Sequence, residues 1–203
     1  MIDMTTPDRR LVLLRHGETE WARLGRHTGT TDIDLTVRGV AQARAAGTLV
    51  AALGLRDPLV LASPRRRAHI TAELAGLSED QRWDALAEWD YGDYEGLTTP
   101  EIREQVPDWT VWTHPCPGGE THESVTSRAD MVLATCEAAL ADRDVILVGH
   151  GHFSRALIAR WIELPVSEGR RVTLSPAAHT VLSYEHGFRT IVTHNVAPER
   201  GIE

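Results

Sequence analysis

Short apolar runs that alternate with helical patterns constrain the fold of this chain more than any other feature. The run 145–148 (VILV) has no polar residue in alternation, which is typical of a strand covered on both faces. Similar runs lie at residues 11–15, 59–62, 180–184 and 190–193. Apolar residues recur at helical spacing in 36–53, where Thr36 is the expected N-cap, and in 66–74, 123–141 and 153–162. Strands alternating with helices predict an α/β fold with a largely parallel sheet flanked by helices.

The segment 91–121 breaks this alternation. It is rich in Gly, Pro and Trp and contains only one short helical pattern, near 100–105. A long insertion of this kind in a compact domain usually serves as a lid or a binding loop. We therefore expect a single domain over residues 1–203, with 91–121 as its lid and 197–203 as a loose tail.

Composition excludes several classes of protein. A net charge of −8 disfavours a nucleic-acid or anionic-membrane binder, which needs a broad basic surface. Cys116 and Cys136 are the only cysteines and form no CxxC motif, so a reducing cytoplasm fits best. Residues 1–10 lack the apolar segment of a secretory signal, and no run approaches the roughly 18 apolar residues of a membrane helix.

Cationic side chains follow three of the apolar runs. Arg15 and His16 end the first, 63–67 (SPRRR) follows the second, and 149–152 (GHGH) follows the third. The carboxyl ends of parallel strands meet at one edge of a sheet, so these side chains should converge there. A glycine after His16 and another after His150 would let the backbone approach a ligand closely. Such a cationic pocket with two imidazoles suits a phosphoryl group.

Each of these motifs taken alone is more often structural or solvent-exposed, and only their coincidence favours catalysis. His150 and His152 could be metal ligands, but no nearby Cys or Asp completes a site, so we expect no metal and no cofactor.

An acidic segment, 86–96 (LAEWDYGDYEG), opens the expected lid. Transfer of a phosphoryl group from a poor leaving group needs a proton donor, and a carboxylic acid beside the pocket could supply it. Glu88 is the candidate, although spacing alone does not separate it from Asp90, Asp93 or Glu95.

Six sequence blocks, in order, resemble the histidine phosphatase superfamily, which contains cofactor-dependent phosphoglycerate mutases and acid phosphatases, including those of actinobacteria. The blocks are RHGETEW, GRHTGTTDIDLT, SPRRRAHITA, LAEWDYGDYEG, PGGET and VGHGHFSRAL, and the resemblance runs from about residue 11 to at least 162. It implies an α/β three-layer sandwich with a mostly parallel central sheet, phosphoglycerate mutase-like, with a lid insertion.

The resemblance also implies roles for five residues. His16 would be the nucleophile that forms a phosphohistidine, with its other ring nitrogen oriented by a backbone carbonyl. Arg15 and Arg67 would clamp the phosphate, and His150, in either its neutral or its cationic form, would donate to the phosphoryl oxygens. Glu88 would be the proton donor and then the base toward water.

Further phosphate contacts are expected, less directly, in the loop after the first strand and at the start of the last helix. They are Arg23, Arg26, Thr28, Gly29 and Gly151. Two departures from the family pattern concern the same pocket: Ala22 stands where many relatives have Asn, and His152 where a small residue is frequent.

The expected function is hydrolysis of small-molecule phosphomonoesters of the acid phosphatase type. The alternatives are a cofactor-dependent phosphoglycerate mutase and a non-catalytic module that binds a phosphorylated ligand. Arg103 is the only basic residue in 98–113, whereas a mutase needs added cations for a second anionic group. Trp109 and Trp112 would either suit apolar leaving groups or pack the lid onto the domain. Dimers are common in the family, and the run 190–193 could pair at a sheet edge, so a homodimer is expected.

Overall fold

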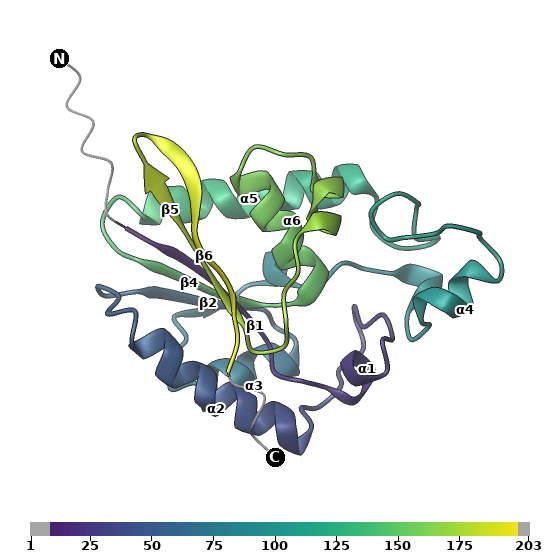
Figure 1. The fold of residues 1–203 in the computed structure, drawn as a ribbon, viewed down its shortest axis with the longest axis horizontal. Helices are drawn as coiled ribbons and strands as arrows, with labels where there is room; N and C mark the ends of the chain where they lie inside the picture. Colours follow the sequence, from purple (N-terminus) through teal and green to yellow (C-terminus); the bar gives the residue numbers. More distant parts are fainter. Residues whose placement is uncertain (1–8, 199–203) are drawn as a thin grey trace.

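A six-stranded sheet forms the centre of the computed structural model, which describes residues 9–198 (Figure 1). Most of the expected tail at 197–203 therefore lies outside the described residues. The strands run in the order β3-β2-β4-β1-β5-β6. Their bounds are β1 Leu11–Arg15, β2 Leu59–Ala62, β3 Gln81–Arg82, β4 Val145–Gly149, β5 His179–Glu185 and β6 Phe188–Val196.

The sheet is parallel across β3, β2, β4 and β1 and antiparallel across β1, β5 and β6. The expected largely parallel sheet is thus confirmed, with an antiparallel pair at one edge. The reason is local: His186 and Gly187, both with positive φ, form a two-residue turn that joins β5 to β6 as a hairpin. Neither β3 nor α1 was expected, because each is too short to show a period.

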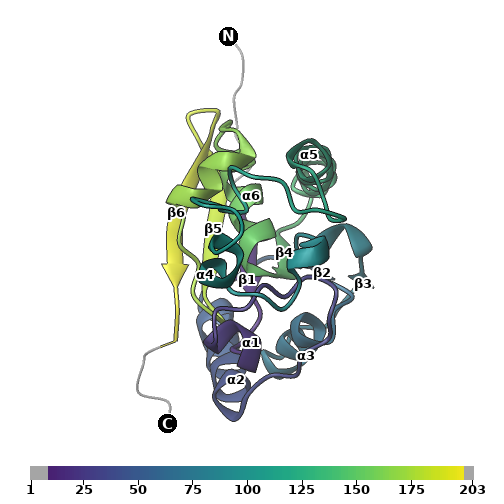
Figure 2. The same ribbon diagram turned by 90° about the vertical axis from the view of Figure 1, so that its right-hand side faces the viewer.

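Helices cover both faces of the sheet, with α2 and α3 on one side and α5 and α6 on the other (Figures 1 and 2). Along β1, Leu11 and Leu13 face one layer of the core, and Val12 and Leu14 face the other. This two-sided burial explains the unbroken apolar runs and confirms the three-layer sandwich. The helices are α1 Glu20–Arg23, α2 Val37–Ala51, α3 Arg66–Leu74, α4 Thr99–Arg103, α5 His122–Ala139 and α6 Gly151–Trp161, with 3-10 turns at Asp84–Leu86, Gly92–Tyr94 and Val166–Arg171. None of the helices in residues 9–198 is both long and apolar enough to cross a membrane.

The segment 91–121 packs its apolar side chains into the core on the α5 and α6 side. Trp109 is 1% exposed and Trp112 is 6% exposed, and the indole of Trp109 donates to the carbonyl of Pro115. Of the two roles considered for these tryptophans, the structure shows packing. The role of lining an apolar pocket is not seen, because neither ring lines the cavity described below.

Candidate active site

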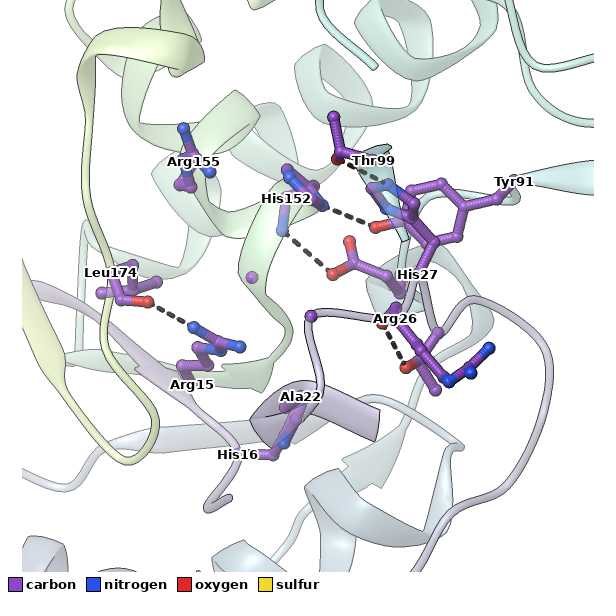
Figure 3. A pocket seen from close by; sticks show the side chains of 14 residues that line it. Arg15, His16, Ala22, Arg26, His27, Tyr91, Thr99, His152, Arg155 and Leu174 are labelled. Carbon is purple, nitrogen blue, oxygen red and sulfur yellow. Dashed lines mark hydrogen bonds between the residues drawn. The ribbon is translucent and has the colours of Figure 1, made fainter. Parts of the chain in front are cut away.

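A cavity of about 240 Å³ opens beyond the carboxyl ends of β1 and β4. Its wall comes from the end of β1, the loop 22–28, the start of the segment 91–121 and the first turn of α6 (Figure 3). Parallel strands bring their carboxyl ends to the same edge, so the sheet itself places the cavity here.

His16 lies on the cavity wall directly after β1 and is held in one tautomer. Its Nδ1–H donates to the carbonyl of Gly17 at 2.7 Å, which leaves the lone pair of Nε2 free to act as a nucleophile. Burial, together with the charges of Arg67 and Arg15, lowers the pKa of His16 well below its ordinary value. The imidazole is therefore neutral, and the expected bond to a backbone carbonyl is present.

Arg15 is a buried cation with an unused hydrogen-bond donor. One terminal nitrogen donates to the carbonyl of Leu174 at 2.5 Å (Figure 3), but the buried Nε has no hydrogen-bond partner. Burial lowers the pKa of Arg15, and the charge of Glu88 opposes this shift. An unsatisfied buried guanidinium is costly, and phosphoryl oxygens would satisfy it.

Arg67 and His150 lie behind His16 rather than on the cavity wall. The Nε–H of Arg67 donates to Nδ1 of His150 at 3.2 Å, so Nε2–H of His150 donates to the hydroxyl of Ser63 at 2.7 Å. Burial and the charge of Arg67 lower the pKa of His150 well below its ordinary value. His150 is thus neutral in this structure, which is the uncharged one of the two forms considered. The His16 and His150 rings are 5.3 Å apart between centroids.

Glu88 is the acid from 86–96 that reaches the cavity. Its two oxygens accept hydrogen bonds from the backbone N–H groups of Trp89, His152 and Phe153 at 2.7–2.9 Å. Two of these amides belong to the first turn of α6, whose N-cap His150 gives no side-chain cap. Glu88 therefore caps this helix from a distant segment, and α6 begins at Gly151, two residues earlier than expected.

The structure separates the other acids of 86–96 from Glu88, since none of them lines the cavity. Asp90 accepts from the N–H of Gly92, and Glu95 accepts from the N–H groups of Gly29 and Thr31. These carboxylates satisfy the backbone of neighbouring loops, which is a structural role.

The expected secondary contacts divide into two groups. Arg26, Thr28 and Gly151 line the cavity. Arg23 does not, because it lies on the surface at the end of α1 and pairs with Glu20. Gly29 does not either, since its N–H is occupied by Glu95.

Several cavity residues were not singled out from the sequence, although three of them lie in the family-like blocks and two in the expected lid. They are His27, Tyr91, Thr99, Arg155 and Leu174. His152, noted in the sequence as a departure from the family pattern, shares a 2.6 Å hydrogen bond with the hydroxyl of Tyr91 through its Nδ1 (Figure 3). Across the described part of the chain, no three His, Cys, Asp or Glu side chains group closely enough to hold a metal ion.

Gly17 serves helix packing rather than ligand approach, which corrects one expectation. A Cβ on Gly17 would lie 2.3 Å from the carbonyl oxygen of Gly39 in α2, and a Cβ on Gly39 would lie 2.0 Å from that of Glu18. Because neither glycine has a Cβ, α2 packs directly against the backbone that carries His16. Gly151, in contrast, does line the cavity.

We expect Gly39→Ala to lower the free energy of unfolding by about 3 kcal/mol, because the new Cβ overlaps backbone that cannot move aside easily. Urea denaturation followed by circular dichroism measures this. Val37→Ala, at a 91% exposed position of the same helix, is the control and should change stability by less than about 0.5 kcal/mol. Equal stability of the two variants would contradict the close-packing argument.

Comparison with known proteins agrees with this geometry. The family model described as histidine phosphatase superfamily (branch 1) matches residues 11–197. The chain is 53% identical to an acid phosphatase of Mycobacterium tuberculosis, over 93% of each chain. It is 39% identical to a 2,3-bisphosphoglycerate-dependent phosphoglycerate mutase of Brucella canis, over 74% of this chain and 80% of that one. The solved structure of the open reading frame Rv3214 from Mycobacterium tuberculosis superposes with a TM-score of 0.93 at 51% identity, covering 95% of this chain and all of that one. The chain belongs to the histidine phosphatase superfamily.

Proposed function

We propose that this protein is a phosphoric monoester hydrolase of the acid phosphatase type that works through a phosphohistidine at His16. One observation carries the proposal: His16 is neutral, presents a free Nε2 to the cavity, and lies beside the buried, partly unsatisfied guanidinium of Arg15. Family membership and the 53% identity to a protein named acid phosphatase support the phosphatase activity.

In the first step, Nε2 of His16 attacks phosphorus and the bond to the leaving-group oxygen breaks. Arg15 binds the phosphoryl oxygens, and Arg67 adds positive charge behind them. His150 is neutral and donates from Nε2 to these oxygens once it exchanges its bond to Ser63 for one to the substrate. Glu88 gives its proton to the leaving oxygen. In the second step, water attacks phosphorus, the N–P bond breaks, and Glu88 takes the proton of that water. His16 and Glu88 both return to their starting states.

The lowered pKa of His16 predicts activity in acid. The nucleophile is the neutral form, which prevails wherever the pH exceeds its pKa, so burial and the two arginines extend the active range to lower pH. We expect kcat/KM for p-nitrophenyl phosphate not to fall as the pH is lowered through about 6.5, the ordinary pKa of a histidine. A rate rising steadily from pH 5 to pH 9 would contradict this prediction.

A paired assay tests the phosphatase against the mutase alternative. Phosphate release from p-nitrophenyl phosphate is followed beside interconversion of 3- and 2-phosphoglycerate with bisphosphoglycerate present. We expect phosphate release, unaffected by EDTA, and negligible interconversion. Dominant interconversion would establish the mutase, and absence of both activities would favour the non-catalytic module.

We also propose that residues 91–121 act as the lid of one domain, since Tyr91 and Thr99 from this segment line the cavity.

We propose a homodimer because β6, a strand at the edge of the sheet, exposes Phe188 and Val192. Light scattering of the purified protein tests it. A cytoplasmic location fits the free thiols of Cys116 and Cys136.

A further inference from the structure

Arg155 places an unneutralised cation on the cavity wall. It lies on the second turn of α6, and its Nε–H donates to the carbonyl of Gly169 at 3.0 Å. The charge of Glu88 acts on it, but no carboxylate within residues 9–198 forms an ion pair with it, whereas Arg160, the other arginine of α6, pairs with Asp130. Burial lowers the pKa of Arg155, which reflects the cost of keeping this charge away from water. A half-buried, unpaired guanidinium in a cavity is suited to an anionic ligand.

His152 offers a neutral donor beside this cation. The Tyr91 hydroxyl and Nδ1 of His152 share a hydrogen bond of 2.6 Å, and burial raises the pKa of Tyr91 well above its ordinary value, so the hydroxyl keeps a proton that it can donate. Burial, then the charge of Arg155, lowers the pKa of His152 well below its ordinary value, so this imidazole is neutral. A neutral imidazole that accepts at Nδ1 carries its proton on Nε2. In the tautomer in which Tyr91 is the donor, His152 has a free Nε2–H, and the residue lines the cavity.

Trp112 holds these two groups side by side. The guanidinium of Arg155 lies over the Trp112 ring at 4.7 Å, and the His152 ring meets the same indole edge-on at 5.3 Å. Gly169 leaves the space that this indole occupies, because a Cβ at position 169 would lie 2.6 Å from the Trp112 ring. Figure 3 shows Arg155 and His152 on the α6 side of the cavity, above Arg15 and Leu174. Their geometry is set by buried packing, as expected of a preformed site.

We propose that Arg155 and Nε2–H of His152 form a second anion subsite, so that the preferred substrates are phosphomonoesters whose leaving group carries its own negative charge, a carboxylate or a second phosphate. This inference rests on the proposed function, because it assumes that the reacting phosphoryl group lies at Arg15 and His16. The inference also revises the argument that residues 98–113 carry too few basic residues to bind a second anionic group. The added charge comes from α6, and the lid supplies the ring that holds it.

Matched substrate pairs test the inference. 3-Phosphoglycerate is compared with glycerol 1-phosphate, and fructose 1,6-bisphosphate with fructose 6-phosphate. We expect kcat/KM to be about 10- to 100-fold higher for the charged member of one pair, as for a charge-assisted hydrogen bond. The pair that shows this preference identifies the anion as a carboxylate or a phosphate. In Arg155→Gln most of the preference should disappear, because kcat/KM falls much further for the charged member of the pair than for the uncharged member or for p-nitrophenyl phosphate.

Arg160→Gln is the matched control, because it removes the same charge from the same helix at a position that pairs with Asp130 on the surface. The Arg160→Gln variant should keep the preference for the charged member of the substrate pair. Equal turnover within both pairs, or an equal loss for charged and uncharged substrates in Arg155→Gln, would overturn the subsite. Binding of the same pairs to His16→Ala, measured by calorimetry, gives the same comparison without turnover. If no substrate is hydrolysed, the proposed function fails, while unequal binding within a pair still supports the subsite.

Discussion

Replacing His16 with alanine is expected to lower phosphate release by a factor of about 10⁴ or more, the scale of losing a nucleophile that acts with its partners as a unit. Arg15, Arg67 and His150 stay in place in this variant, but no other side chain on the cavity wall combines a free nitrogen lone pair with their position. His27 and His152 are occupied by Thr99 and Tyr91 at one ring nitrogen each and lie on another wall.

His194→Ala is the matched control, because this imidazole is exposed on β6 and contacts only Thr180. It should leave kcat/KM unchanged. Wild-type enzyme quenched at alkaline pH during turnover should carry a phosphoryl group on the peptide containing His16, detected by mass spectrometry. A substantial residual rate in His16→Ala, or a phosphoryl group on another residue, would rule out the proposed intermediate.

Replacing Glu88 with glutamine is expected to lower kcat by about 10²- to 10⁴-fold for an alkyl phosphate such as glycerol 1-phosphate. The loss for p-nitrophenyl phosphate should be much smaller, because nitrophenolate leaves without taking up a proton. The amide keeps one oxygen, which can accept from the N–H groups of Trp89 and Phe153, but its NH2 group cannot accept from the N–H of His152, so part of the cap of α6 is lost. Both substrates meet the same altered cap. The ratio of the two rates therefore reports proton donation separately from folding.

Asp90→Asn provides the comparison for that experiment. Asp90 belongs to the same acidic segment and accepts from the N–H of Gly92, but it does not line the cavity. Asp90→Asn should leave the ratio of the rates for glycerol 1-phosphate and p-nitrophenyl phosphate unchanged. Equal losses for both leaving groups in Glu88→Gln, at unchanged thermal stability, would show that Glu88 positions α6 and does not transfer the proton.

Much of the fold could be predicted because its signals are local. Each residue of β1 alternates between the two core layers, and unbroken apolar runs reveal such strands directly. The N-cap at Thr36 is local, since its side chain accepts from the N–H of Gly39, whereas the start of α3 also uses Asp32, which accepts from the N–H of Arg66. The antiparallel edge was harder to foresee, since a two-residue turn with positive φ at His186 carries no glycine at its first position.

The candidate site could be predicted only in part. Sequence placed Arg15, His16 and His150 at one sheet edge, since parallel strands share the direction of their carboxyl ends. It did not show that His150 is turned toward Ser63 and Arg67, because that tautomer depends on buried hydrogen bonds between distant segments. Nor did it show that Arg23 is held on the surface by Glu20.

The sequence by itself determined the layered α/β fold, the family and the strand ends at which phosphate chemistry is expected, since these follow from short-range periodicity and ordered motifs. Only the tertiary structure decided which carboxylate reaches the cavity and which groups face it from the other side. Glu88 meets the amide of His152 across 64 residues of chain, and Arg155 and His152 meet on the ring of Trp112. Contacts of this kind are set by how the layers pack, and packing between distant segments leaves no period or spacing in the sequence.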